Sequence, residues 1–600
     1  MFRLPSLRRS FAEFQSTLLR FPLVLFSAFL LCISGILLTY KNPDNTEHWL
    51  MRIALTSALA IPSFLAMNLR GRYRGLNLIR QLFEHLVLIA ALVAFFLSMD
   101  HPPSAQDGIR FAMLMTASHL LVACAGFLGR GTTRAFWQFN RMLFIRIITS
   151  GIFSLVLFAG LAGALGALHA LFDLDIADDL YGRVFILIMT LFNTSFFLAG
   201  VPASSEALEQ EEHYPKVLKV FAQFVLLPLV FIYLCILLSY EVKIILTWNL
   251  PRGWVSNLVI AYGIVGILSF LLLYPVRNDH HWIRLFTRWF YLLLLPLLVL
   301  MFIAVFVRIG NYGLTEPRVI GLLLALWLSF ITLIFLFRPG TDIRLIPASL
   351  AIVALLFAAG PFSAEALSRN SQRSRLEQQL TDLKLLQDKK AVPSEDPSSV
   401  SREAQGNLSS TILYLLKYHG PESLQPWIET DTMSGGERQS YTYAQDVMKS
   451  LNLEFVYPGA SSITELSWVN FNAPHEAISV EGFDWVLLLS TRDQQHRDSG
   501  LHLRSKGPKP GFQLFDGNKS ISPVIDPAVL FEQLLNKHQP KNAMIELPAE
   551  QLSQDVETDH YTLKIYYTRL AGPLHSDPDS DPRSVSVDPD YSGYLLIRKK

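Results

Sequence analysis

The most regular feature of this sequence is a series of long apolar runs that fills its first 360 residues. Short polar connections separate the runs. The runs themselves contain few charged side chains. An apolar helix needs about 20 residues to cross the hydrocarbon core of a bilayer, and most runs reach that length. The pattern predicts an α-helical polytopic membrane bundle of about eleven helices over residues 21–360. The runs are Phe21–Tyr40, Leu50–Leu69, Leu82–Met99, Ile109–Leu128, Ile147–Phe172, Val184–Val201, Val220–Tyr240, Trp254–Tyr274, Phe286–Val307, Val319–Phe337 and the shortest, Leu345–Gly360.

The apolar pattern ends at residue 360, and residues 361–405 predict a juxtamembrane helix followed by a linker. Leu376, Leu380, Leu383 and Leu386 recur at helical spacing, whereas Lys389–Gln405 is rich in Pro, Ser and charged residues. Burying a leucine side chain is favourable by about 1.5–3 kcal/mol. We therefore expect these leucines to pack on something apolar, either the domain that follows or the end of the bundle.

Residues 406–600 predict a small α+β domain outside the membrane. Apolar and alternating segments indicate a mixture of helices and strands. The helices are expected at Leu408–Tyr418, Tyr443–Leu451 and Ala528–Leu535, the last capped by Asp526, and the strands at Ala477–Val480, Trp485–Ser490, Gly511–Leu514, Tyr561–Thr568 and Gly593–Ile597. All three cysteines of the chain lie in the apolar runs. The domain is therefore expected to fold by itself, without disulfides or metal.

The balance of basic and acidic residues also changes where the apolar pattern ends. Residues 1–362 carry 27 Lys and Arg against 18 Asp and Glu, and the remainder carries 24 against 32. The acidic second half argues against nucleic-acid binding. In the first half, basic residues gather in alternate connections, as at Arg70–Arg80 and Arg130–Arg146. Since Lys and Arg favour the cytoplasmic side, residues 1–20 are predicted to be a cytoplasmic basic segment, and eleven crossings place residues 406–600 outside the cytoplasm.

Four short strings of sequence occur in a characteristic order. They are Leu198-Ala-Gly-Val-Pro202, Thr247-Trp-Asn-Leu-Pro-Arg-Gly-Trp-Val-Ser256, Tyr312-Gly-Leu-Thr-Glu-Pro-Arg318 and Gly360-Pro-Phe-Ser363. Through them the chain resembles the bacterial multi-pass membrane proteins grouped as domain of unknown function 4153, best over residues 130–430. The resemblance implies an integral inner-membrane protein with a C-terminal part outside the membrane, which the charge pattern assigns to the periplasm. It implies no activity, cofactor or functional residue.

Few polar side chains lie near the middle of the apolar runs. His119 and Asn193 do, and burying such groups in hydrocarbon is costly. They are candidates for an intramembrane polar site on the path of a proton or solute. Hydrogen bonding between helices is the alternative interpretation, and two residues favour it over a transport pathway.

A docking surface for the C-terminal domain is expected at the outer side of the bundle. Two connections there are punctuated by Pro and Gly, which indicates tight turns, and the juxtamembrane helix adjoins them. Well-formed turns without any partner are the alternative. The residues assigned to docking are Pro251, Trp254, Tyr312, Leu376, Leu380 and Leu383.

Catalytic motifs are missing from the sequence, including the Gly-x-Ser-x-Gly elbow, His-Glu-x-x-His and paired Cys-x-x-Cys. We therefore expect no enzyme activity, cofactor or metal. The leading hypothesis is a non-enzymatic envelope protein, anchored in the lipid bilayer, with an interaction or sensory domain that binds an envelope protein or a small ligand. A transporter or channel with a regulatory extracytoplasmic domain is the alternative, followed by a membrane enzyme acting on lipid or glycan.

Overall fold

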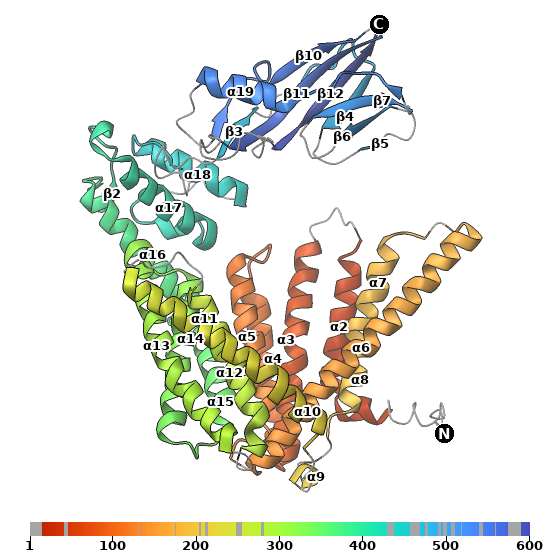
Figure 1. Ribbon diagram of the computed structural model, residues 1–600, viewed down its shortest axis with the longest axis vertical. Coiled ribbons are helices and arrows are strands. Elements are labelled where there is room, and N and C mark those ends of the chain that lie inside the picture. The colour runs from red at the N-terminus through yellow and green to blue at the C-terminus, as the bar shows by residue number, and fades with distance from the viewer. Residues whose placement is uncertain are drawn as a thin grey trace. The chain divides into compact units, whose positions relative to one another are not determined.

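The structure is a computed structural model, and it divides the chain into two compact units, Met1–Gln372 and Arg373–Lys600 (Figure 1). The boundary falls inside a single helix, α16 (Ala364–Asp382). The structure describes residues 15–40, 46–129, 131–174, 176–202, 204, 206–209, 214–247, 255–277, 281–428, 437–456, 468–473, 478–489, 494–495, 501–505, 511–517, 519–538, 544–558, 560–573 and 590–600.

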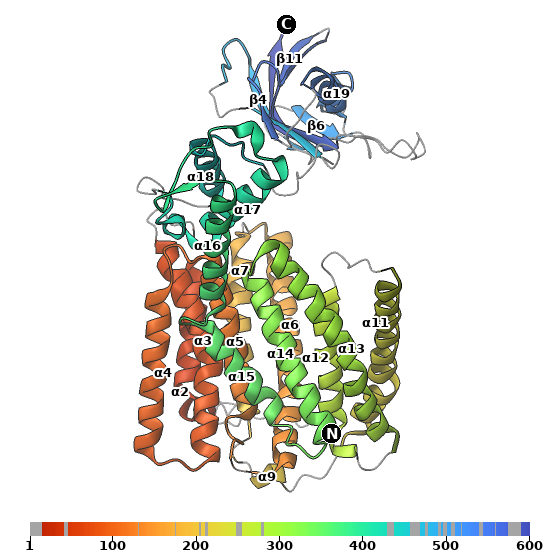
Figure 2. The same cartoon turned by 90° about the vertical axis from the view of Figure 1, so that its left-hand side faces the viewer.

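The first unit is a helical bundle in which a helical segment coincides with every predicted run (Figure 2). Two helices contain π-helical turns, η1 and η2, which join shorter pieces into longer segments. In order, the elements are α2 (Pro22–Leu37), α3 (Thr46–Tyr73), α4 (Leu78–Ser98), α5 (Ala105–Cys124), α6 (Thr133–Phe172), α7 (Asp179–Leu187), η1 (Ile188–Phe192), α8 (Asn193–Ala199), α9 (Glu206–Glu209), α10 (Lys216–Phe221), η2 (Ala222–Leu226), α11 (Leu227–Thr247), α12 (Val255–Leu273), η3 (Tyr274–Val276), α13 (His281–Tyr312), α14 (Glu316–Phe337) and α15 (Leu345–Ala358).

The predicted count of eleven membrane helices is not confirmed. Within the described ranges, eight helices are long and apolar enough to cross a membrane. The helices α2 and α15, with 16 and 14 residues, are shorter than a full crossing needs. The helix α5 is less apolar because it includes Asp107, Arg110 and His119. The structure thus supports a membrane bundle without fixing the number of crossings.

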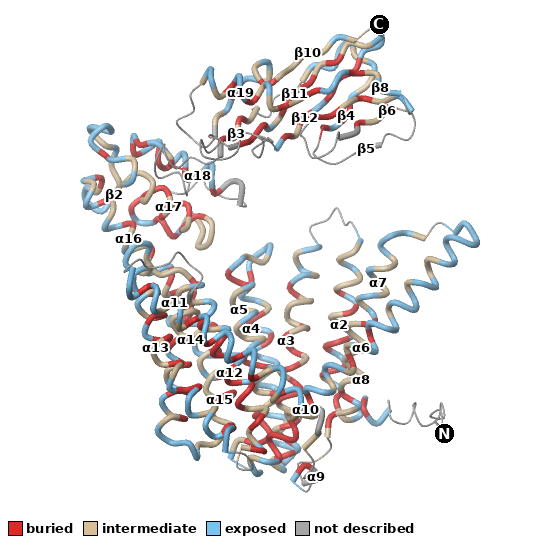
Figure 3. Tube along the Cα trace, in the orientation of Figure 1, coloured by how far each residue is buried: buried red, intermediate tan, exposed pale blue. Residues whose placement is uncertain are grey.

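Burial in the bundle is concentrated where helices meet, as Figure 3 shows. Tyr291, Leu294 and Met301 on α13, with Leu328 and Ile331 on α14, are at most 1% exposed. In contrast, only 11% of the apolar window of α4 and 17% of that of α6 is buried. Apolar surface on this scale is unfavourable in water, so lipid is the medium that suits these helices.

Polar caps define where several helices begin. The side chain of Asn77 accepts a hydrogen bond from the Arg80 N–H at the start of α4, at 3.0 Å. Ser104 and Asp107 form a capping box on α5, and Thr132 caps α6. Such caps satisfy first-turn N–H groups that have no partner within the helix.

The connections that follow α3, α5, α8 and α14 meet at one end of the bundle, which we call the arginine end. Tyr73 at the end of α3 packs edge-on against Phe127 after α5, with ring centroids 5.5 Å apart, and its hydroxyl donates to the Pro202 carbonyl at 3.0 Å. Arg344 before α15 donates to the Phe127 carbonyl at 2.7 Å. These connections include the arginine-rich ones of the sequence, so the fold gathers their positive charge.

The second unit begins with a helical cluster. It contains the last turns of α16, then β1 (Leu386–Gln387), β2 (Lys390–Ala391), η4 (Pro397–Ser399), α17 (Arg402–His419), η5 (Pro421–Leu424) and α18 (Glu437–Ser450). Leu376 and Leu380 are fully buried in its core with Leu408 and Leu415, and Leu383 is partly buried against it. The leucine stripe therefore packs within the second unit.

The segment Lys389–Gln405 is not the free linker that its composition predicted. Its Ala391 N–H donates to the Trp427 carbonyl at 2.8 Å, and its Ser394 N–H donates to the Leu451 carbonyl at 2.9 Å. Val400 is buried in the same core, and α17 begins at Arg402, before the expected boundary at residue 406. The composition correctly indicates a polar segment. It does not reveal the backbone hydrogen bonds that hold this segment against the helical cluster.

The rest of the second unit is rich in β-structure. A six-stranded sheet has the order β4-β12-β11-β3-β9, with β10 paired to β11, and a four-stranded sheet has the order β5-β6-β7-β8. All pairs are antiparallel except β3 with β9. The strands are β3 (Trp468–Asn472), β4 (Trp485–Leu489), β5 (Gln494–Gln495), β6 (Leu501–Ser505), β7 (Phe512–Asp516), β8 (Lys519–Ser520), β9 (Met544–Glu546), β10 (Ser553–Glu557), β11 (Tyr561–Pro573) and β12 (Asp590–Lys599).

The helix α19 (Pro527–His538) packs on the larger sheet through Phe531, which is fully buried 5.8 Å from the Phe471 ring. Asp526 caps it as predicted, accepting from the Ala528 N–H at 2.9 Å. One predicted strand, Ala477–Val480, is wrong: residues 478–480 form no strand, and Ala477 lies outside the described residues.

The composition of the helical cluster indicates where a soluble fragment of the second unit should begin. A soluble fragment starting at residue 406 lacks Leu376, Leu380 and Val400, whereas one starting at residue 373 keeps them. Since deleting a single buried leucine side chain costs about 2–5 kcal/mol, the longer fragment should protect the helices α17 and α18 much better. Hydrogen exchange of the amides in Leu408–Leu416, measured on both fragments, tests this. Equal protection would show that α16 contributes nothing to the cluster.

Candidate functional site

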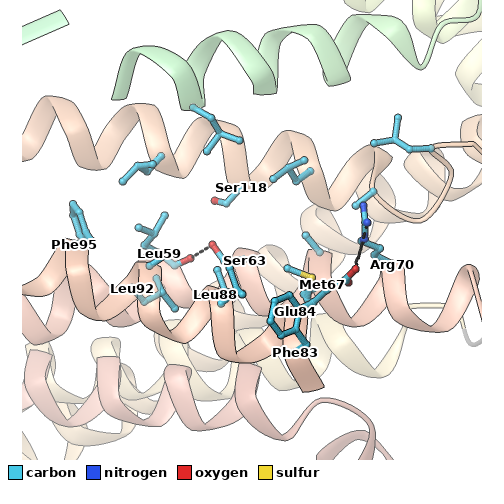
Figure 4. A pocket seen from close by; sticks show the side chains of 18 residues that line it. Leu59, Ser63, Met67, Arg70, Phe83, Glu84, Leu88, Leu92, Phe95 and Ser118 are labelled. Carbon is cyan, nitrogen blue, oxygen red and sulfur yellow. Dashed lines mark hydrogen bonds and ion pairs between the residues drawn. The ribbon is translucent and has the colours of Figure 1, made fainter. Parts of the chain in front are cut away.

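An apolar cavity of about 420 Å³ lies between α3, α4, α5 and α15 (Figure 4). Its lining on α3 extends from Leu59 to Arg70, which is about 16 Å along a helix axis. The lining residues are Leu59, Ser63, Ala66, Met67, Arg70, Phe83, Glu84, Val87, Leu88, Ala91, Leu92, Phe95, Leu114, Ser118, Leu121, Ala125, Leu128 and Leu355. The cavity is therefore elongated and mainly hydrocarbon-lined.

Small side chains create this space. Ser63 and Ala66 lie about one turn apart on α3, and Ala91 lines the cavity from α4. Ser118 and Ala125 contribute from α5. Residues three or four apart share a helix face, so small residues at this spacing leave a continuous gap where larger ones would fill it.

Charged groups occur at one end of the cavity only. Arg70 Nε lies 3.3 Å from a carboxylate oxygen of Glu84, and Arg80 Nε lies 3.4 Å from the other. Figure 4 shows the Arg70–Glu84 pair at that end. One carboxylate shared by two guanidinium groups leaves a surplus positive charge. The Glu84 side chain is only 16% exposed, whereas the Arg80 side chain that carries the surplus charge is 59% exposed.

The middle of the cavity offers little hydrogen bonding. The Ser63 hydroxyl donates to the Leu59 carbonyl at 2.8 Å, and the Ser118 hydroxyl donates to the Met115 carbonyl at 2.9 Å. Both hydroxyl protons are thus used within their own helices. An apolar channel that ends in a cationic group suits an amphipathic molecule with a negative head.

The cavity is open on the side of α4. Phe83 and Val87 both line it, yet they remain 65% and 53% exposed. They belong to a helix whose apolar surface suits lipid. The cavity lining on α4 therefore adjoins apolar surface that suits lipid.

The two predicted intramembrane residues are in different settings. His119 is exposed on α5, and its Nδ1 lies 2.8 Å from the Met115 carbonyl of its own helix. Asn193 begins α8, and its Oδ1 is buried without a hydrogen-bond partner among the described residues. Neither lines the cavity, and no hydrogen bond between described residues joins them. The polar site that they were predicted to form stays a prediction.

The structure places the residues predicted for docking in different parts of the protein, and it does not describe all of them. Pro251 and Trp254 lie outside the described residues. Tyr312, at the end of α13, is 57% exposed, and its carbonyl accepts from Gln372 Nε2 at 3.0 Å. Leu376 and Leu380 of α16 belong to the core of the helical cluster, and Leu383 and Leu386, which follow α16, pack against it. Leu386 lies in β1 and not on the predicted helix. The role of Leu376, Leu380 and Leu383 in docking stays untested.

Sequence reasoning missed Arg52, which lies inside an apolar run and is 1% exposed. Its guanidinium lies 4.8 Å from the Trp49 ring and 4.6 Å from the Phe96 ring. Nε donates to the Phe96 carbonyl in the last turn of α4 at 3.0 Å, and the His101 ring is a further partner. A charged residue within the run Leu50–Leu69 was the available signal. Here the negative end of α4 and two aromatic faces stabilise the cation.

The fold and the cavity define a class of protein: a helical membrane bundle joined through a shared helix to a second unit of helices and β-sheet. The chain belongs to the family described as domain of unknown function (DUF4153), which it matches over residues 25–396, more than half its length. The matched region contains the bundle, the cavity and all of α16. This confirms the family indicated by the sequence strings.

A relative from Pasteurella multocida, described as an uncharacterized protein, is 27% identical over 235 residues. That match covers 38% of this chain and 39% of the relative, so the chain spans well under half of that protein's length. No solved structure matches the chain.

Proposed function

We propose that this chain is a bacterial inner-membrane protein that binds an anionic lipid in the cavity between α3, α4 and α5. The observation that carries this proposal is the hydrocarbon-lined cavity that ends at Arg70 and Glu84, the second of which also pairs with Arg80 outside the lining. The second unit is then a periplasmic interaction or sensory domain attached to a lipid-binding bundle. This refines the binding hypothesis drawn from the sequence by naming a ligand class.

Selectivity in such a site must come from the head of the lipid. An acyl chain leaving the bilayer for an apolar cavity exchanges one hydrocarbon environment for another, so hydrophobic transfer contributes little. Charge-assisted hydrogen bonds from guanidinium groups to a phosphate are about twice as strong as neutral ones. Arg80, whose side chain is 59% exposed, is accessible to a phosphate without first losing all contact with Glu84.

The sidedness of the bundle agrees with an anionic ligand. The cavity's charged groups belong to the end of α3 and the start of α4, at the arginine end of the bundle. Basic connections favour the cytoplasmic side, and the cytoplasmic leaflet carries the anionic lipids that attract such residues. A lipid of that leaflet would present its head at Arg70 and Arg80 and its acyl chain toward Leu59.

We predict that the two ends of the chain lie on opposite sides of the membrane. A reporter enzyme active only in the periplasm should be active when fused after Lys600 and inactive when fused after Tyr73, because the arginine end is retained in the cytoplasm. A cytoplasmic reporter at the same two positions should give the reverse pattern. Periplasmic inactivity of the Lys600 fusion, with the fused protein intact, would place both ends on one side and refute the proposed topology.

We predict that filling the cavity displaces the lipid. Ala91→Phe introduces an aromatic ring at a residue that lines the cavity. Overpacking costs about 1–3 kcal/mol. Phosphatidylglycerol should therefore bind to this variant about tenfold more weakly. Ala90→Phe is the matched control, because Ala90 directly precedes Ala91 on α4 and is equally classed as exposed, but it does not line the cavity. Native mass spectrometry of the full chain, titrated with phosphatidylglycerol in detergent, measures both affinities.

Charge selectivity provides a second arm of that experiment. Arg80→Gln removes the surplus positive charge while the Arg70–Glu84 pair remains. The preference for phosphatidylglycerol over phosphatidylcholine should fall, with acyl-chain binding preserved. If Ala91→Phe and Ala90→Phe bind phosphatidylglycerol equally, the cavity is not the binding site.

A further inference from the structure

A second group of arginines lies on another side of α3, where the chain enters α2. Arg20 and Arg72 both face the buried ring of Phe21, with guanidinium carbons 4.8 Å and 5.7 Å from its centroid. Arg72 donates to the Arg20 backbone carbonyl at 3.2 Å, and Asn68 Nδ2 donates to the same oxygen at 3.0 Å. Two cationic side chains are therefore held close together around one aromatic ring.

No carboxylate among the described residues pairs with either of these arginines. This distinguishes them from other arginines of the bundle: Arg70 and Arg80 pair with Glu84, and Arg110 lies 3.0 Å from Glu365. Burial, and then the charge of Arg72, lower the pKa of Arg20. Holding two like charges together is unfavourable unless an anion accompanies them.

The hydrogen-bond donors of the pair are largely uncommitted. Each guanidinium carries five N–H donors in a planar fork. Arg20 donates through one terminal nitrogen to the Pro202 carbonyl, while its Nε is buried without a partner among the described residues. Arg72 uses one terminal nitrogen for the Arg20 carbonyl. The contacts to carbonyls fix the positions of both forks and leave other donors for an acceptor.

From this geometry we propose that Arg20 and Arg72 form a binding site for a phosphate group, separate from the cavity. Paired guanidinium forks match the several acceptor oxygens of phosphate, which a single carboxylate matches less well. The site joins the start of α2, the end of α3 and the connection after α8, all at the arginine end. A phospholipid head and a free phosphate compound share this chemistry. The site goes beyond the proposed lipid cavity and stands without it.

The test uses the full chain in detergent and measures the affinity for two probes, phosphatidylglycerol and inorganic phosphate, by native mass spectrometry and by ligand-dependent shifts in Tm. The variants are Arg72→Gln, Arg72→Lys and the double variant Arg20→Gln/Arg72→Gln. Arg338→Gln is the matched control. Arg338 is exposed in the α14–α15 connection, and its substitution by Gln removes the same positive charge as Arg72→Gln does. All proteins are compared in the Ala91→Phe background as well, so that binding in the cavity is counted separately.

Arg72→Gln should weaken binding of the responsive probe about tenfold, the loss expected for one charge-assisted hydrogen bond. Arg72→Lys should lose less, and Arg338→Gln should change nothing. Loss of phosphatidylglycerol binding alone identifies a lipid head as ligand, and loss for both probes identifies a general phosphate site. Because Arg72 is exposed, the Arg72→Gln variant should fold. The Tm of this variant without ligand verifies that it does. If folded Arg72→Gln binds both probes as tightly as Arg338→Gln, or if neither probe binds the parent, the site does not exist.

Discussion

Arginine side chains that donate to backbone carbonyls in or after the last turns of helices are the interaction on which this bundle depends most. The final carbonyls of a helix have no partner within it and carry the negative end of its dipole, which is costly where water is scarce. A guanidinium supplies the missing donors, and the helix end stabilises its charge. The pairs are Arg20 with Pro202, Arg52 with Phe96, Arg72 with Arg20, Arg318 with Gly313, and Arg344 with Phe127 and Gly131.

This solution leaves an excess of positive charge, because a carbonyl satisfies a donor without neutralising the cation. Where a carboxylate is also present, as Glu84 is between Arg70 and Arg80, part of the charge remains. Where none is described, as at Arg20 and Arg72, the whole charge remains. Both places lie at the end of the bundle that the charge pattern assigns to the cytoplasm, beside anionic lipid heads. In the proposed function, interactions that hold the helix ends would thus also form the binding sites for anions.

The sequence predicted whatever depends on local pattern. Apolar runs identified the bundle helices, and the Asp526–Pro527 start identified α19. It failed where the answer depends on contacts between distant segments. Lys389–Gln405 has the composition of a linker, but hydrogen bonds to the Trp427 and Leu451 carbonyls hold it against the cluster. The cavity could not be foreseen, because it arises from small residues on separate helices, although Arg70 and Glu84 were both visible as charges near apolar runs.

Whether the cavity between α3, α4 and α5 holds an anionic lipid can be seen directly by electron cryomicroscopy of the full chain in nanodiscs made with phosphatidylglycerol. A bound lipid should give elongated, non-protein density running from Leu59 to Arg70, about 16 Å long, with its head beside Arg80. A cavity closed by its own side chains, or well-resolved walls with no density between them, would contradict the proposed lipid binding.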